Sequence, residues 1–462
     1  MNNYRNKSFT KSWKLSYLIW LFNILICCQG EGTDEIERPT PTIEIEEETT
    51  TNNDINYNES LTLNLQQEPS SDSEANRLGR SFGIADFTPT GIYLKPEESL
   101  KITTQLNQGI VVPSVLIGTY ARTVYSYEPQ IKSLNSSIPI TVTNTTDRDQ
   151  MIYLRFVGQT LEGRATVTLE GGHKAPYFKL GETTNAEFIE MLDNYVYSEI
   201  QLQSENSIVL ASKTTALKYQ NQDWELLGKT LDEIIAVEAS IDGLNPTAND
   251  INQTNRNRYL LTESEDERYW MAAWFYATLY NQVNAVDYLI NVQNLINDGW
   301  GPWHELGHQH QLSNLTWNET TEVTVNIYSL AVERHFGHQS RLKRDGIWDK
   351  IQDFIATPIT EKDYNSDALG PFERLCLYQQ LWLHYGDSFF IDLHQKVREE
   401  GLSITGKNQK MGYFILKASE VTQNDLSAFF KEWGFSIEES YYEAVANLEY
   451  PQPSVDLTSL RE

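Results

Sequence analysis

The stretch His304-Glu305-Leu306-Gly307-His308 has the residue types and spacing of a metal site. Residues four apart in an α-helix lie on one face, so His304 and His308 can present two imidazoles to one tetrahedral zinc ion. Zinc lowers the pKa of a bound water to about 7, and an adjacent carboxylate can take the proton as that water attacks a carbonyl. The spacing therefore predicts one catalytic zinc ion, with Glu305 as the general base and not as a ligand.

A catalytic zinc site needs a third protein ligand and keeps its fourth position for water. The downstream candidates are Glu319, Glu322 and Glu333. The Thr316-x-x-Glu319 pattern has the form of a capping box, which would occupy Glu319 at the start of the next helix. Glu322 then falls one turn inside that helix and is the predicted third ligand, with Asn326 on the same side as a candidate supporting residue.

The residues before the motif form an aromatic-rich turn, 298–303, and Pro302 suits the first turn of a helix. Trp300 and Trp303 are candidates for supporting the metal ligands or for binding substrate. Gly307 costs helix stability relative to alanine. We therefore expect close backbone packing at Gly307.

His310 points about 200° around the helix from His308. It could support a ligand through a carboxylate, bind substrate or be a structural histidine, and the sequence leaves these alternatives open. An oxyanion formed during hydrolysis also needs an electrophile, and Tyr328 is a candidate. Four other histidines have no ligand-like spacing to the motif and are predicted to be structural or to lie on the surface: His335, His338, His384 and His394.

The elements that must position these residues change in character along the chain. Short alternating apolar and polar runs between residues 87 and 180 predict a β-sandwich: 99–103, 115–118, 138–142, 152–157 and 165–169. A helical period starts at Asn185, in the expected N-cap position, and returns around Trp224. Beyond Asp298 the chain is predicted to be mostly helical to Leu448. The expected fold is multidomain α+β, with a β-sandwich at 82–184, a zincin-like metallopeptidase domain at 185–338 and a C-terminal helical region at 339–462.

The N-terminus has the pattern of an export signal, predicted over residues 1–28. Its apolar run is short for a transmembrane span, and residues 24–28 resemble the lipobox of bacterial lipoproteins, with Cys28 or Cys27 as the lipidated residue. An ordinary signal peptide is the alternative. Residues 29–81 are predicted to form an acidic, disordered tether. Cys376 would remain as a single thiol, so no disulfide framework is expected. These features predict export across the inner membrane and lipid anchoring at the bacterial cell surface or outer membrane.

The formal net charge of −28 disfavours nucleic acids and anionic lipids as partners, because both require basic surface. Membrane association is therefore expected only through the N-terminal lipid anchor. In such a host the Asn-x-Ser/Thr sequons are expected to be incidental: Asn135, Asn144, Asn252 and Asn318.

Residues 299–301, 304–311 and 322–326 together resemble the core of the enhancin-like, mucin-targeting zinc metallopeptidases, a group of gluzincins. Residues 90–94 with 115–118, and 425–435, resemble that family's N-terminal β-sandwich and C-terminal helical segment, so the likeness covers residues 82–437. The resemblance implies zinc bound by His304, His308 and Glu322, with Glu305 as the base. It also implies heavily O-glycosylated protein substrates such as mucins.

The chain departs from that family at residues 270–276, Trp-Met-Ala-Ala-Trp-Phe-Tyr. Members commonly carry a Met-His-x-Gly-Tyr-Pro-like segment at this place. The departure puts substrate specificity in question, whereas the ligands and the base are retained.

The predicted function is a secreted or cell-surface zinc endopeptidase that acts on glycoproteins. One alternative is a non-catalytic lipoprotein that binds glycans or mucin and carries a structural or vestigial zinc site. A structural site usually has four protein ligands, and the sequence offers no obvious fourth. Another alternative is a gluzincin aminopeptidase.

Overall fold

The computed structural model describes residues 60–248 and 251–462, all within one compact unit that spans residues 51–462. The predicted signal sequence, Cys27, Cys28 and the first part of the tether lie outside the described residues. The predicted end of the tether at residue 81 is wrong, because strand β1 (Leu61–Gln66) and helix α2 (Ser71–Leu78) lie within the predicted tether. Within the described ranges, no helix is both long and apolar enough to cross a membrane.

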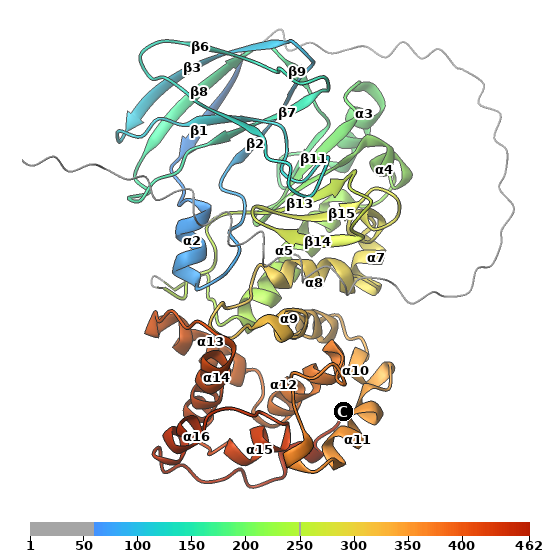
Figure 1. Cartoon of the computed structure of the whole chain (residues 1–462). Helices are drawn as coiled ribbons and strands as arrows, with labels where there is room; N and C mark the ends of the chain where they lie inside the picture. Colours follow the sequence, from blue (N-terminus) through green and yellow to red (C-terminus); the bar gives the residue numbers. More distant parts are fainter. Residues whose placement is uncertain (1–59, 249–250) are drawn as a thin grey trace, which may run out of the picture. The chain divides into compact units, whose positions relative to one another are not determined.

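Two antiparallel sheets follow from the alternating runs (Figure 1). The four-stranded sheet has the order β1-β8-β3-β6, with β8 at Arg164–Glu170, β3 at Ser99–Gln108 and β6 at Ile140–Thr143. The five-stranded sheet has the order β5-β4-β7-β2-β9: Gln130–Ser133, Ser114–Ile117, Gln150–Arg155, Thr88–Leu94 and His173–Lys174. Alternate side chains of both sheets meet in one buried cluster that includes Ile102, Val167, Val115 and Ile152. Each of the five predicted strand segments overlaps a strand.

A third, six-stranded mixed sheet was not predicted from the sequence. Its order is β10-β11-β12-β13-β15-β14: Tyr177–Lys179, Glu199–Gln203, Ser207–Ser212, Tyr259–Ser264, Ala277–Asn281 and Met271–Trp274. β12 and β13 are buried throughout most of their length, so Ile208-Val209-Leu210 reads as a continuous apolar run without alternation. β14 is an edge strand and pairs only with β15.

Helices pack against this sheet: α3 (Asn185–Asn194), α4 (Lys213–Lys218) and α5 (Trp224–Ile241) connect its strands, and α6 (Val286–Ile290) and α7 (Val292–Asn297) follow its last strand. The predicted N-cap at Asn185 is displaced by one residue. Thr184 caps α3, because its hydroxyl accepts from the Glu187 amide at 3.3 Å and the Glu187 carboxylate accepts from the Thr184 amide at 2.8 Å.

From residue 300 onward the chain is helical. This part begins with α8 (Trp300–His308) and α9 (Thr321–His335), and a short 3₁₀ turn at Asn318–Thr320 directly precedes α9. The helices that follow are α10 (Arg341–Arg344), α11 (Ile347–Ala356), α12 (Pro371–Tyr385), α13 (Ser388–Glu400), α14 (Lys407–Thr422), α15 (Ser427–Glu432) and α16 (Glu439–Ala446), with 3₁₀ turns at Ile359–Glu361 and Leu457–Ser459. The apolar stretch 375–397 is split between α12 and α13 at Gly386, whose φ of 73° ends α12. The overall α+β class is confirmed.

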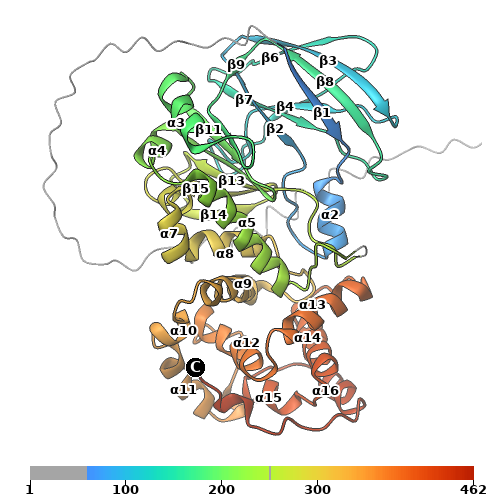
Figure 2. The same cartoon turned by 180° about the vertical axis from the view of Figure 1, so that it is seen from behind.

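Helices α8 and α9 lie between the six-stranded sheet and the C-terminal helices (Figures 1 and 2). α8 contacts β14 and α9, and α9 in turn contacts α12. The site therefore lies on two helices that are packed on both sides.

Candidate metal centre

Two glycines allow α8 to approach its neighbours closely. A Cβ on Gly307 would lie 2.9 Å from the Val325 carbonyl oxygen of α9, and a Cβ on Gly301 would lie 2.4 Å from the Met271 sulfur of β14. Neither distance is tolerable for a real side chain at these packed positions. The close packing expected at Gly307 is confirmed, and it holds the two ligand-bearing helices together.

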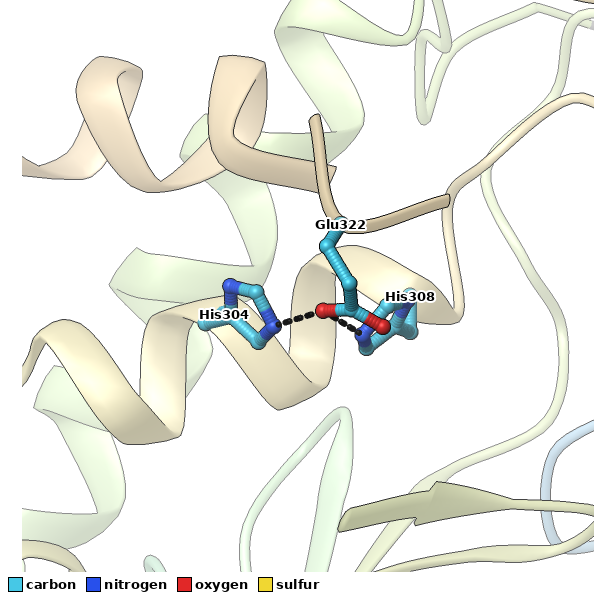
Figure 3. Close-up of side chains that lie close together, drawn as sticks. All are labelled: His304, His308 and Glu322. Atoms are coloured by element: carbon cyan, nitrogen blue, oxygen red, sulfur yellow. Dashed lines mark hydrogen bonds and ion pairs between the residues drawn. The ribbon is translucent and has the colours of Figure 1, made fainter. Parts of the chain in front are cut away.

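His304, His308 and Glu322 converge in space (Figure 3). The Glu322 Oε2 atom lies 3.1 Å from His304 Nε2 and 3.5 Å from His308 Nε2. One potential ligand atom from each residue lies within 4.8 Å of the others, and among the described residues no other three acidic, histidine or cysteine side chains form such a group. Two imidazole nitrogens with one carboxylate oxygen are a donor set that zinc prefers.

Two carboxamides fix which imidazole nitrogen faces the centre. Asn326 Nδ2 donates to the Glu322 carbonyl at 2.9 Å, so its Oδ1 faces His304 Nδ1 at 2.7 Å. Gln311 Nε2 donates to the Thr321 carbonyl at 2.7 Å, so its Oε1 faces His308 Nδ1 at 2.8 Å. Because a carboxamide oxygen can only accept, both Nδ1 atoms carry the proton and both Nε2 lone pairs point to the centre.

Burial raises the pKa of Glu322, but the neighbouring His308 and His304 outweigh burial and hold it well below its usual range. Burial lowers the pKa of His308, whereas Glu322 raises it, and the net shift is upward. The Glu322 side chain is 24% exposed and the His304 side chain 12%, so the cluster is open to solvent on one side. The three residues therefore fit a zinc ion with a position left for water or substrate.

Glu305 follows His304 in α8 and is buried. Burial raises its pKa to about 7; the charge of His304 lowers it and that of Glu322 raises it further. A carboxyl group with a pKa near neutrality can both accept and return a proton. This environment suits the role predicted for Glu305 from the motif.

The capping-box prediction at Thr316 is wrong. The Thr316 hydroxyl lies 3.2 Å from the Thr324 hydroxyl, and Thr320 occupies the N-cap position of α9. Glu319 instead accepts from Lys407 Nζ at 2.7 Å. This ion pair, and not a capping box, keeps Glu319 away from His304 and His308.

Two other sequence candidates lie away from the cluster. The Tyr328 hydroxyl is buried and donates to the His310 carbonyl oxygen at 3.0 Å, so its prediction as the oxyanion donor is wrong. Trp303 is buried against Phe336 and His338. Trp300, by contrast, is half-buried against Phe372, with the Arg341 guanidinium 4.8 Å from its ring centroid.

His310 is fully buried, and of the three roles that the sequence left open it has the structural one. Its Nδ1 accepts from Arg80 Nη2 at 2.9 Å, and its Nε2 lies 3.0 Å from the Tyr259 hydroxyl. Burial and the charge of Arg80 lower its pKa to about 4. It supports the packing after α8 and does not contact the three candidate ligands.

Tyr125, in the connection between β4 and β5, was missed by the sequence reasoning. Its ring packs 4.8 Å from the rings of Tyr269 and Trp274, and its hydroxyl donates to the Ala273 carbonyl at 3.3 Å. Burial, Tyr269 and the charge of Glu305 all raise its pKa, so its hydroxyl is within electrostatic reach of the candidate base. No local sequence pattern links it to α8, because it lies far upstream of the motif.

The family model of peptidase M60, enhancin and enhancin-like proteins, matches residues 171–434, more than half of the chain. The chain belongs to this family. The match includes β14, α8 and α9, and the enhancin-like resemblance seen in the sequence is confirmed.

Among curated relatives, the M60 chain is 26% identical over 387 residues to TRPM8 channel-associated factor 3 of Rattus norvegicus, covering 78% of this chain and 39% of the relative. Human TRPM8 channel-associated factor 1 is 26% identical over 301 residues, covering 64% of this chain and 32% of the relative. The chain thus spans about a third to two fifths of the length of these curated relatives.

The fold is also that of solved structures. A conserved protein of unknown function from Bacillus anthracis has a TM-score of 0.79 and 28% identity, covering 87% of this chain and 81% of that one. ZmpB metallopeptidase from Clostridium perfringens has a TM-score of 0.76 and 19% identity, covering 87% and 82%. The M60 catalytic domain of ZmpC from Clostridium perfringens, solved in complex with the sialyl T antigen, has a TM-score of 0.73 and 19% identity, covering 86% and 81%.

Proposed function

We propose that this M60 chain is a zinc endopeptidase that hydrolyses peptide bonds in glycoproteins. The observation that carries the proposal is the convergence of two Nε2 lone pairs and the Glu322 carboxylate beside the buried base Glu305. When bound by these residues, zinc supplies Lewis acidity toward water and toward a carbonyl oxygen.

The chain's own residues then handle the proton. The Glu305 carboxylate accepts a proton from the attacking water and returns it to the nitrogen of the leaving amine. Asn326 and Gln311 keep the imidazoles of His304 and His308 turned so that Nε2 is available. We assign no donor to the developing oxyanion, because the Tyr125 hydroxyl, like that of Tyr328, donates to a backbone carbonyl.

The proposed substrates are proteins with mucin-type O-glycans. Support comes from membership of the M60 family and from the fold shared with the ZmpC catalytic domain that was solved with the sialyl T antigen. The divergent segment 270–276 forms β14 next to α8, and Trp270 is 39% exposed there. We expect this edge strand to set a specificity of its own.

The direct test compares wild type with Glu305→Gln on a mucin-type O-glycoprotein and on the same protein after deglycosylation. We expect wild type to cleave the glycosylated form, and Glu305→Gln to lose about 10²–10⁴-fold in rate while keeping the zinc content of wild type. Glu319→Gln, a nearby carboxylate that pairs with Lys407, is the matched control and should stay active. Full activity in Glu305→Gln would contradict the mechanism.

A binding function without proteolysis is the second candidate, favoured by the names of the curated relatives, which refer to association with a channel. Mucin binding by the zinc-loaded protein without cleavage of any glycoprotein would support it. Cleavage only of peptides with a free N-terminus would instead indicate an aminopeptidase, and blocked and free peptide pairs separate these outcomes.

We also propose, from the N-terminal sequence, that the chain is exported and anchored by a lipid on Cys28 or Cys27. Mass spectrometry of the N-terminal peptide from cells tests this. A mature N-terminus without acylated cysteine would overturn it.

A further inference from the structure

A polar cavity of about 170 Å³ lies apart from the metal centre. It is lined by the β4–β5 connection, by the residues that lead into β7, by the start of β11 and by Glu265 after β13. At about 30 Å³ per molecule it has room for five or six waters. This space suits one small polar ring and not an extended chain.

The charged groups of the cavity are largely matched to one another. Arg122 Nε donates to Glu199 at 2.5 Å, and Arg148 Nη1 donates to Glu265 at 2.9 Å. Asp149 adds a third carboxylate to the lining. With three carboxylates against two guanidinium groups, the cavity does not favour a phosphate, a sulfate or another anion.

Two polar groups of the cavity are left without hydrogen bonds. Arg122 Nη1 is buried, lies 3.4 Å from Glu265 and makes no hydrogen bond. The Asp149 carboxylate is half-buried. Among residues 60–248 and 251–462, it has no hydrogen-bond or ion-pair partner. The buried Arg122 Nη1 carries an energetic cost while it makes no hydrogen bond, whereas the Asp149 carboxylate is open to the cavity. A ligand hydroxyl can donate to a carboxylate and accept from a guanidinium, so it could satisfy both kinds of group.

From this we propose that the cavity binds one neutral monosaccharide unit. The lining is too polar for a lipid tail, and the described residues form no metal-ligating group here. Tyr127 also lines the cavity, and aromatic side chains combine an apolar ring with a polar hydroxyl. A neutral polyhydroxylated ring therefore fits the donors, the acceptors and the volume.

The loop that lines the cavity also packs on β14, the strand that contacts α8. Arg122 and Tyr127 line the cavity, and Tyr125 between them packs on Trp274 of β14. On the opposite wall, Glu265 lines the cavity and Tyr269 packs on Tyr125. The bound sugar would thus lie on a loop that packs against β14 beside α8. That it belongs to a glycoprotein substrate rests on the proposed function, whereas sugar binding itself does not.

The test is binding of methyl α-glycosides of galactose, N-acetylgalactosamine, glucose and mannose to the full chain, measured by saturation-transfer NMR and by titration calorimetry. We expect at least one glycoside to bind wild type and Asp149→Ala to bind it about tenfold or more weakly, since a hydrogen bond to a charged group is lost. The matched control is Asp147→Ala, two residues away and exposed, which should bind as wild type. Thermal melting of each variant verifies folding, and Asp149→Asn keeps the side-chain volume if Asp149→Ala proves unstable.

A second arm separates this cavity from the metal centre. Binding should persist in His304→Ala and in excess chelator, so loss of peptidase activity would leave the inference standing. It is overturned if no glycoside binds wild type, or if both Asp149 variants bind as wild type does. Binding of glycine or inorganic phosphate in place of every glycoside would also overturn it, because the ligand class would then be wrong.

Discussion

His308 is the last residue of α8 and His310 lies two residues later, yet the two side chains belong to two different kinds of polar cluster. His308 meets His304 and Glu322 in a group that solvent can reach. His310 is fully buried beside Arg80 and Asp242. Both clusters combine histidine with carboxylate, yet only one has the arrangement of a metal centre.

The difference lies in how the lone pairs are used. Around His310, the Asp242 carboxylate meets donors on both oxygens: it accepts from Arg80 at 2.6 Å and from Arg398 at 2.7 Å, whereas the buried Glu238 carboxylate makes no hydrogen bond. In the metal cluster, amide partners occupy only the outer nitrogens of the imidazoles, and the inner ones converge on a carboxylate. A buried charge cluster stabilises packing, whereas converging lone pairs without donors between them make a site for a cation.

The largest expected effect is on metal binding when the third ligand is changed. Glu322→Gln removes the anionic ligand, so we expect zinc content after dialysis to fall from about one per chain to near zero. Glu319→Gln lies three residues earlier, is bound to Lys407 and should retain zinc. Equal zinc content in the two variants, measured by atomic emission, would show that the carboxylate was misassigned.

The next largest effect concerns stability in the other cluster. Asp242→Asn leaves the buried Arg80 and Arg398 without a carboxylate, so we expect a loss of about 3–5 kcal/mol in the free energy of unfolding. Asp345→Asn, which breaks exposed pairs with Arg341 and Arg344, should cost about 1 kcal/mol or less. Urea unfolding of the metal-free proteins compares the two, and similar losses would remove the distinction between the clusters.

Truncating the carboxamides should weaken the metal cluster without abolishing it. Asn326→Ala and Gln311→Ala free the outer imidazole nitrogens, and we expect zinc affinity to fall about 10–100-fold in each. Asn314→Ala removes an amide that only bonds the backbone of Leu402 and Ile404, and it should leave affinity unchanged. Competition with a chromophoric chelator measures all three; unchanged affinity in both site variants would mean that the amides do not orient the ligands.

The last effect is a pH dependence within the charge cluster. Burial lowers the pKa of His310 to about 4, so its contribution to stability is complete above pH 6.5 and is lost as the pH falls toward 4. Glu238 behaves in the opposite way, because burial raises its pKa well above the usual value and its contribution is lost as the pH rises. Glu238→Gln should therefore gain stability relative to wild type above pH 4.3, by about 1.4 kcal/mol per pH unit at most. Parallel stability curves for the two proteins between pH 5 and 8 would contradict this.

The sequence predicted the candidate ligands and five strands of the first two sheets, β3, β4, β6, β7 and β8, because both depend on local spacing. His304, His308 and Glu322 were expected together, and the structure brings them together. The six-stranded sheet escaped because β12 and β13 are buried and show no alternation. Residues 61–78 were taken for tether because their polar composition hid pairing with β8 across about a hundred residues of sequence.

The surroundings of the site could not be predicted for a similar reason. Tyr125 packs on Trp274 of β14 from a loop of the first sheets, and Arg80 reaches His310 from the segment after α2. Both contacts arise from the packing of segments that are distant in the sequence, so no periodicity in the sequence predicts them. The capping box predicted at Thr316 does not form, because the 3₁₀ turn at Asn318–Thr320 moves the N-cap of α9 to Thr320.

The most direct measurement of the central claim is an anomalous difference map at the zinc edge from crystals of the zinc-loaded protein. We expect a single peak about 2.0–2.2 Å from the Nε2 atoms of His304 and His308 and from a carboxylate oxygen of Glu322, with no peak near His310. A zinc ion bound through Nδ1, or absent from these three residues at full zinc loading, would contradict the account.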